Sequence, residues 1–159
     1  MSNIIYINVL ADSLQKKKGV LKEILECTKK QEVLLKQDGL DEEAFLKIIQ
    51  DKQRYLDKMK ELDEGFEVIY QRVRTELEQQ KDMYQDEITK IQHLIVQVTG
   101  LGVDIEALEK RNKVQMDKVI LDRKQKIKGK RVNNTAASNY YRNMVDHHYS
   151  QSYFLDKKK

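Results

Sequence analysis

Residues 42–98 read EEAFLKIIQDKQRYLDKMKELDEGFEVIYQRVRTELEQQKDMYQDEITKIQHLIVQV, with no proline and with Gly65 as the single glycine. Apolar and aromatic residues recur here at alternating steps of three and four, the spacing of one helical face. We therefore predict a helix over 42–98 that supercoils against a partner. Its seam comprises Phe45, Ile49, Leu56, Met59, Phe66, Tyr70, Val73, Leu77, Tyr84, Ile91, Leu94 and Val98, with polar interruptions at Lys52, Asp63, Gln80 and Glu87.

A first helix is predicted over about residues 3–37. Asn3 suits an N-cap, because its side chain can accept from an unpaired backbone N–H. Asp38 and Gly39 form a stop, with Gly39 suited to the left-handed position after a helix. The seam weakens at Lys17, Gln31 and Glu32. Its recurring members are Ile7, Leu10, Leu14, Leu21, Ile24, Leu25, Thr28 and Leu35.

A third helix is predicted over 104–128. The stretch Thr99-Gly100-Leu101-Gly102 should break the helix before it, and Gly129 should end it. This helix should fold back on the C-terminal half of the second one. Its stripe consists of Ile105, Leu108, Met116, Val119, Ile120 and Ile127, with Asn112 inside it.

These patterns predict an all-α, elongated antiparallel three-helix coiled-coil bundle over residues 1–129. A flexible, tyrosine-rich tail follows at 130–159, in which a short amphipathic helix would carry Tyr140, Tyr141, Met144 and Val145 on one face. Polar segments with one apolar face commonly order when they bind. Residues 39–103 carry a net charge of −5 and residues 104–131 a net +5, which favours antiparallel pairing of the helices.

The composition points to a cytoplasmic protein without enzymatic chemistry. Cys27 is the single cysteine, which suits a reducing compartment. The N-terminus lacks the features of a signal peptide, and no apolar run approaches the roughly 20 residues that span a bilayer. No phosphate-binding loop, nucleophile elbow or Cys-x-x-Cys motif occurs. We therefore expect no catalytic residues, no cofactor, no metal site and no membrane insertion.

Two small features have a functional and a structural interpretation. His147 and His148, beside Asp146, are metal-ligand types, but adjacent histidines on a helix point about 100° apart and chelate poorly. Cys27 has two nearby lysines that would lower its pKa slightly, yet such a cysteine is more often a small apolar filler. The structural interpretation is favoured for both.

Residues 123–131 contain six basic side chains in nine positions. Such a run can contact nucleic acid or an acidic membrane surface. No aromatic residue is interleaved with it, and basic residues also stabilise a helix C-terminus. We expect no nucleic-acid binding, which leaves an acidic protein partner or a solvated helix end.

The expected helix lengths suggest a binding function. A second helix of about 57 residues is longer than either neighbour, so part of its apolar seam would stay uncovered. Self-association into a homodimer, the tail or a partner helix would fill that surplus. Helix-in-groove recognition, with anchors at i, i+3, i+4 and i+7, is the expected mode.

Several stretches, spread over nearly the whole chain, carry a family likeness. They are Gln31-Glu32-Val33-Leu34-Leu35, Gly39-Leu40-Asp41, Leu46-x-x-Ile49-x-x-Lys52-Gln53-x-x-Leu56, Leu62-Asp63-x-x-Phe66, Glu109-Lys110-Arg111-Asn112 and Tyr153-Phe154-Leu155-Asp156-Lys157-Lys158-Lys159. In these stretches the chain resembles the FlgN-type flagellar export chaperones, which bind hook–filament junction proteins.

The resemblance implies a three-helix antiparallel chaperone. Such a protein would hold C-terminal helices of hook-associated proteins, prevent premature assembly and deliver its cargo to the type III export apparatus. A tail tyrosine would contact the export gate. Alternatives are a FliT-like flagellar chaperone, a generic coiled-coil adaptor and a homodimerising structural protein. The resemblance places cargo binding at Leu108, Asn112, Met116, Val119, Ile120, Tyr140, Tyr141, Met144 and Val145.

Overall fold

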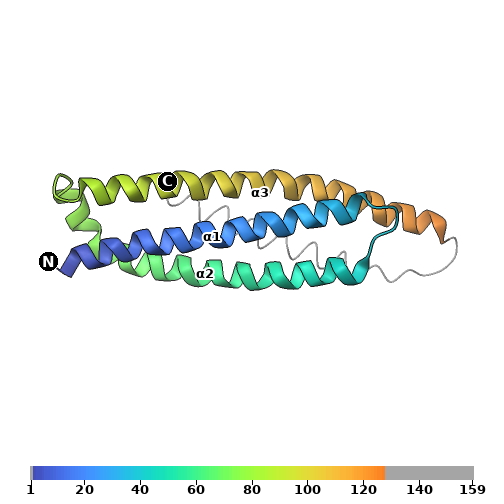
Figure 1. The fold of residues 1–159 in the computed structure, drawn as a ribbon, viewed down its shortest axis with the longest axis horizontal. Helices are drawn as coiled ribbons and strands as arrows, with labels where there is room; N and C mark the ends of the chain where they lie inside the picture. Colours follow the sequence, from blue (N-terminus) through green and yellow to red (C-terminus); the bar gives the residue numbers. More distant parts are fainter. Residues whose placement is uncertain (1, 128–159) are drawn as a thin grey trace.

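The computed structural model describes residues 2–127 as three long helices in one elongated bundle (Figure 1). Helix α1 spans Ser2–Lys36, α2 spans Glu42–Gln79 and α3 spans Gln85–Lys126. Helix α1 packs closely against both others, and α2 runs antiparallel to α1 and α3. The prediction of an all-α, three-helix architecture is confirmed for this part of the chain, whereas residues 130–159 lie outside it.

The predicted bounds of the second and third helices are wrong. Instead of one helix over 42–98, α2 ends at Gln79 and α3 begins at Gln85. Instead of a break at 99–102, α3 continues through Gly100 and Gly102, so no separate helix begins at 104. Each glycine in a helix interior costs about 1 kcal/mol relative to alanine. Burial of Val98 and Ile105 on either side of these glycines opposes that cost.

The reversal between α2 and α3 depends on Tyr84 and not on glycine or proline. The backbone amides of Gln80 and Met83 donate to the carbonyls of Glu76 and Gln80, at 2.8 and 3.1 Å. The ring of Tyr84 is buried in a cluster with Val73 and other core residues, and its hydroxyl donates to the Glu76 carboxylate at 2.7 Å. This hydrogen bond and burial both raise the pKa of Tyr84.

Because the chain reverses between α2 and α3, the second helix is shorter than predicted. The three helices contain 35, 38 and 42 residues, so no helix extends far beyond its neighbours. The expected surplus of apolar seam on one helix is therefore wrong. Any binding surface has to come from the faces that the bundle leaves open.

The connection between α1 and α2 follows the sequence prediction. Gly39 has φ +87°, in the left-handed region that favours glycine. Asp41 is the N-cap of α2, and its carboxylate accepts from the backbone N–H of Ala44 at 3.1 Å. Helix α2 then continues without interruption through Gly65.

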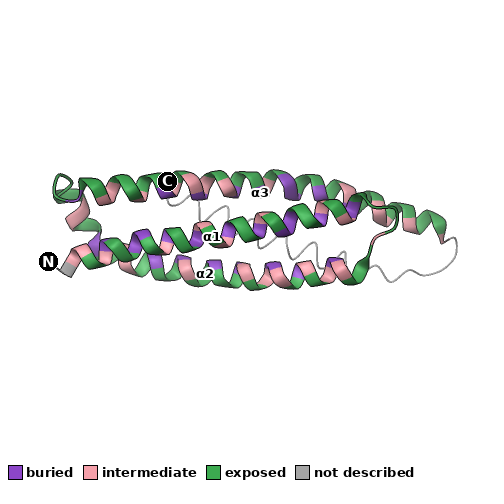
Figure 2. Cartoon of the chain, viewed as in Figure 1, coloured by how far each residue is buried: buried purple, intermediate pink, exposed green. Residues whose placement is uncertain are grey.

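Three apolar clusters fill the interior along the bundle axis, where Figure 2 colours the inward positions as buried. The first lies near the α2–α3 turn, the second near mid-length and the third near the α1–α2 connection. Each joins residues from all three helices. Their buried members are Ile7, Leu10, Ala11, Leu14, Phe66, Val73, Tyr84 and Leu94, then Leu21, Ile24, Leu56, Met59, Val98 and Ile105, then Leu35, Phe45, Ile49 and Met116.

Within residues 2–127, no helix is both long and apolar enough to cross a membrane.

Substitutions of the neighbouring residues Met83 and Tyr84 should have unequal effects on stability. We expect Tyr84→Phe to lower the free energy of unfolding by about 1 kcal/mol, because the hydrogen bond to Glu76 is lost. We expect Tyr84→Ala to lower it by about 3–5 kcal/mol through the cavity it leaves. Met83→Ala is the control, since Met83 is 69% exposed, and it should stay within about 0.5 kcal/mol. Urea unfolding measures all three, and equal losses for Tyr84→Ala and Met83→Ala would contradict the account.

Candidate functional site

The residues predicted to bind cargo are divided between the interior and the undescribed end of the chain. Leu108, Asn112 and Met116 are buried, at 4%, 0% and 2% exposure. Val119 and Ile120 are half-buried against the cluster near the α1–α2 connection. A partner could reach the first three only if the bundle opened. The other predicted residues, Tyr140, Tyr141, Met144 and Val145, lie outside the part that the structure describes.

Asn112 belongs to a buried polar layer that joins all three helices. We call Thr28, Gln31, Lys52, Glu109 and Asn112 the polar layer; all are at most 6% exposed. The Lys52 ammonium donates to Gln31 Oε1 at 2.8 Å and forms an ion pair with Glu109. Thr28 Oγ1 lies 3.4 Å from Glu109 Oε1, and Asn112 Nδ2 donates to the Thr28 carbonyl at 3.0 Å. Charged and amide groups thus meet where the apolar seams are interrupted.

A second buried contact lies between α1 and α2, where Lys17 Nζ is 2.5 Å from Asp63 Oδ1. Both residues are at most 3% exposed. Burial lowers the pKa of Lys17, while the Asp63 carboxylate opposes that shift. Burial likewise lowers the pKa of Lys52 against the opposing effect of Glu109. Each lysine therefore needs its carboxylate in place to remain charged in the interior.

These contacts explain the polar interruptions of the sequence pattern. Lys17 and Gln31, which weaken the predicted α1 seam, occupy the buried face of α1 and meet Asp63 and Lys52, which interrupt the α2 seam. A helix that slid along its neighbour would leave these charges buried without a counter-charge, at several kcal/mol each. The polar layer and the Lys17–Asp63 pair therefore favour a single register of the helices.

Removing one partner of the Lys52–Glu109 ion pair should destabilise the fold more than removing both partners. We expect Lys52→Met to lower the free energy of unfolding by about 3–5 kcal/mol, because the Glu109 carboxylate stays buried without its cation. In Lys52→Met/Glu109→Leu no charge remains in the polar layer, so we expect less than half of that loss. Urea unfolding compares the two variants, with Lys58→Met, which removes a half-exposed lysine of α2, as the control. A double variant less stable than Lys52→Met would contradict this interpretation.

Neither a reactive cysteine nor a metal site is supported by the described residues. Cys27 is buried, and burial raises the pKa of its thiol, which is the opposite of a reactive cysteine's environment. No group of three or more metal-ligating side chains occurs in residues 2–127, and His147 and His148 lie outside that range.

The first part of the basic run is engaged with acidic groups of the same chain. The Arg123 guanidinium pairs with Glu42 and donates to the Leu40 carbonyl at 3.4 Å, which ties the end of α3 to the start of α2. Lys126 lies 3.2 Å from Asp122. The rest of the run, from 128 onward, lies outside the described residues.

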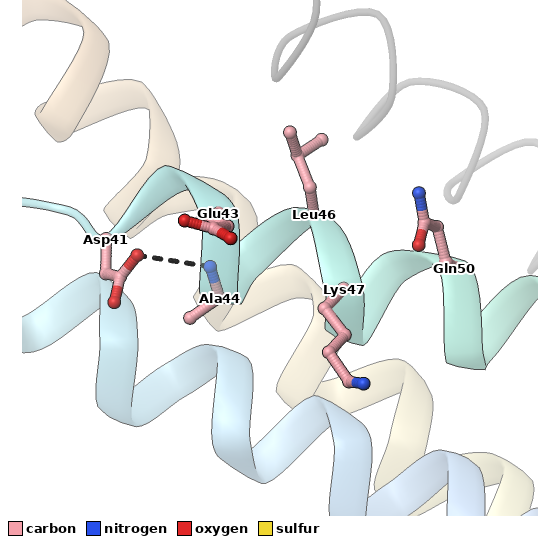
Figure 3. Close-up of a pocket in the computed structure, with 6 residues that line it drawn as sticks. All are labelled: Asp41, Glu43, Ala44, Leu46, Lys47 and Gln50. Carbon is pink, nitrogen blue, oxygen red and sulfur yellow. Dashed lines mark hydrogen bonds between the residues drawn. The ribbon is translucent and has the colours of Figure 1, made fainter.

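A shallow depression lies on the first turns of α2 (Figure 3). The Asp41 carboxylate is already bonded to the Ala44 amide, and Leu46 and Lys47 point to different sides of the helix. Its polar groups do not converge on a common point, so it is a weak candidate for a ligand site. The lining residues are Asp41, Glu43, Ala44, Leu46, Lys47 and Gln50.

A second concave surface runs between α1 and α2, and we call it the α1–α2 groove. Its volume is about 330 Å³, and its apolar surface exceeds its polar surface. Gly65 lies in it, with open space where a side chain would begin. Ser13 Oγ lies 3.4 Å from the Leu62 carbonyl at the same place, so α1 and α2 approach closely there. The groove is lined by Val9, Leu10, Asp12, Ser13 and Lys16 from α1 and by Glu61, Leu62, Gly65, Phe66 and Ile69 from α2.

Sequence reasoning missed the α1–α2 groove because, apart from Leu10 and Phe66, its residues flank the predicted seams and do not form them. Val9 precedes the seam residue Leu10, and Leu62 and Ile69 flank Asp63 and Tyr70. Val9 at a polar-face position and Gly65 within a strong helical pattern were the available signals. Neither says by itself that the two positions lie side by side.

Comparison with known proteins does not assign the chain to a family. No family model matches it, and neither a curated protein nor a solved structure does.

Proposed function

We propose that this protein is an export chaperone of the FlgN type that acts by binding and not by catalysis. It would hold a C-terminal helical segment of a hook-associated flagellar protein in the cytoplasm and deliver it to the type III export apparatus. The observation that carries the proposal is the α1–α2 groove, an open, mainly apolar hollow of about 330 Å³ between two antiparallel helices.

The groove has the features that an amphipathic helix requires. Val9 is 42% exposed at its edge, and Leu62 and Ile69, seven residues apart on α2, are half-buried. Gly65 lies midway between them and leaves room for an incoming side chain. Apolar anchors at i, i+3 or i+4 and i+7 of a bound helix match this repeat. Lys16 and Glu61 add charges of both signs to the lining, so they can fix the direction of the bound helix.

The family likeness gains indirect support from the interior. The stretches on which it rests contain Gln31, Lys52, Asp63, Glu109 and Asn112. These residues belong to the polar layer and to the Lys17–Asp63 pair. We take the likeness at positions that favour one helix register as support for the proposed class of protein. We propose that the three helices supercoil as an antiparallel coiled coil.

The proposed mechanism is the covering of an apolar seam. A hook-associated protein whose terminal helices are separated from their assembly partners exposes an apolar edge, and such edges associate. Laying one of these edges in the α1–α2 groove removes it from water and prevents polymerisation. The tyrosine-rich segment 130–159 lies outside the described residues, and its part in binding and its contact with the export gate stay predictions.

Two further candidates share the same geometry. A FliT-like flagellar chaperone or a generic coiled-coil adaptor would use the same groove for a different helix. Co-purification from a flagellated cell extract distinguishes them, because only the proposed function predicts hook-associated proteins among the captured chains.

The groove makes a specific prediction about binding. We expect Val9→Glu to weaken binding of the C-terminal helical segment of a hook-associated protein by about tenfold or more, because a buried carboxylate would replace an apolar contact. Gly65→Arg should have a similar effect by filling the groove. Val68→Glu is the matched control, since Val68 on α2 is 70% exposed and lies outside the groove. Isothermal titration calorimetry measures the affinities, and circular dichroism checks that each variant is folded.

Two outcomes would count against the proposal. If no hook-associated segment binds the unaltered chain, the proposed function is wrong. If a segment binds but Val9→Glu and Val68→Glu have equal effects, cargo binds elsewhere, and the buried residues of α3 and the segment 130–159 become the remaining candidates.

A further inference from the structure

The outward face of α3 carries an apolar stripe that the bundle does not use. We call Val96, Val103, Val114 and Leu121 the α3 stripe; they are 69%, 58%, 53% and 57% exposed. Their spacings of seven, eleven and seven residues keep them within about 20° of one another around the helix. Figure 2 colours the outer edge of α3 as exposed along most of its length.

The α3 stripe is the main concentration of exposed apolar residues on the described chain. Nine large apolar residues are exposed among residues 3–127, and four of them form this stripe. The five others, Ile5, Val9, Val33, Val68 and Met83, are distributed over α1, α2 and the turn. Gly100 and Ala107 are exposed between stripe members, so a neighbouring helix could approach closely there. Single exposed apolar residues are ordinary, whereas an aligned set commonly marks an interaction surface.

The spacing of the stripe is symmetric about a point between residues 108 and 109. If a second α3 lies antiparallel across that point, Val96 faces Leu121 of the other copy and Val103 faces its Val114. The same pairing holds in the opposite direction, because a two-fold axis relates identical surfaces. The small residues Gly100 and Ala107 then face the longer side chains of Asp117 and Lys110, so bulk on one copy meets space on the other.

The charges beside the stripe have the same symmetry. In an antiparallel two-fold pair, equivalent edges of the two helices meet. Asp104 and Arg111 lie on one edge of the stripe, so Asp104 of each copy faces Arg111 of the other copy. Glu106 and Lys110 lie on the other edge and are matched in the same way. Over the whole helix, residues 85–106 carry four acidic and one basic side chain, and residues 107–126 carry three acidic and seven basic.

The present partners of these groups leave them available for such contacts. Lys110 lies 3.4 Å from Glu106 on the same helix, and Arg111 lies 3.6 Å from Glu32 of α1. The lysine and arginine side chains are 72% and 67% exposed, so these ion pairs contribute little to stability. Exchanging them for contacts across a dimer costs little, while it adds electrostatic preference for the antiparallel orientation.

We propose that a second copy of this chain packs on the α3 stripe, with the two α3 helices antiparallel about a two-fold axis between residues 108 and 109. The contact runs for about 37 Å along the helix at 1.5 Å per residue. One helix face of this length lies near the lower limit of about 1,000 Å² for a specific interface, so the dimer dissociates at micromolar concentration. The α1–α2 groove takes no part in it, so the dimer and the proposed function are independent.

Mass measurement over a concentration series tests the dimer. Sedimentation equilibrium of the full chain between about 5 and 500 µM should show the mass rising from 18.9 kDa towards twice that value. Val103→Glu/Val114→Glu should weaken association by about tenfold or more, because four carboxylates would enter the interface. Val68→Glu should associate as the unaltered chain does, since Val68 is 70% exposed but lies on α2.

The register has its own test. A chain with Val103→Glu mixed with a chain with Val114→Lys should form a heterodimer at least tenfold tighter than either variant's own dimer. In the mixture one Glu–Lys pair and one Val–Val pair face each other, whereas each variant alone places two charges against valines. A monomer mass throughout the series would overturn the proposal, as would undiminished association of Val103→Glu/Val114→Glu. No preference in the mixture would overturn the register.

Discussion

The ion pair between Lys52 and Glu109 is the constraint on which the rest of the structure depends. It joins α2 to α3, and Gln31 of α1 accepts from the same ammonium group at 2.8 Å, so one buried cation binds all three helices. Apolar heptad seams alone tolerate sliding by a whole repeat, because leucine and isoleucine recur every seven residues. A charge buried in such a seam has a low free energy only opposite its partner. Stability and register therefore come from different residues.

Both candidate surfaces follow from that register. The α1–α2 groove exists because Val9 and Ser13 of α1 lie beside Leu62 and Gly65 of α2, next to the Lys17–Asp63 pair. The α3 stripe faces outward because the polar layer turns Glu109 and Asn112 inward, which leaves Val103 and Val114 on the opposite side of the helix. A shift in register would change what lies along the groove, and a rotation of α3 would bury part of the stripe.

The sequence predicts the helical class, the first helix and its stop because each has a local signal. These signals are the helical spacing between Ile7 and Leu35, the left-handed Gly39 and the cap at Asp41. Each can be recognised from residues that are close together in the sequence. The second reversal was missed because Tyr84 stabilises it through burial and a bond to Glu76, while its neighbours keep helical spacing. The groove and the pairing of polar interruptions join residues tens of positions apart, so only the packed helices bring them together. The binding role of α3 stays a prediction, and its residues Leu108, Asn112 and Met116 lie in the interior.

Distances between spin labels test most directly whether the polar layer sets the register. Labels at the exposed positions Asp57 of α2 and Lys113 of α3, in a Cys27→Ala background, report sliding of these helices by pulsed electron paramagnetic resonance. A slip of one heptad moves them about 10 Å along the axis. We expect one narrow distance with the polar layer intact and a broad or split distribution in Lys52→Met/Glu109→Leu. The same narrow distance in both chains would contradict the account and assign the register to apolar packing alone.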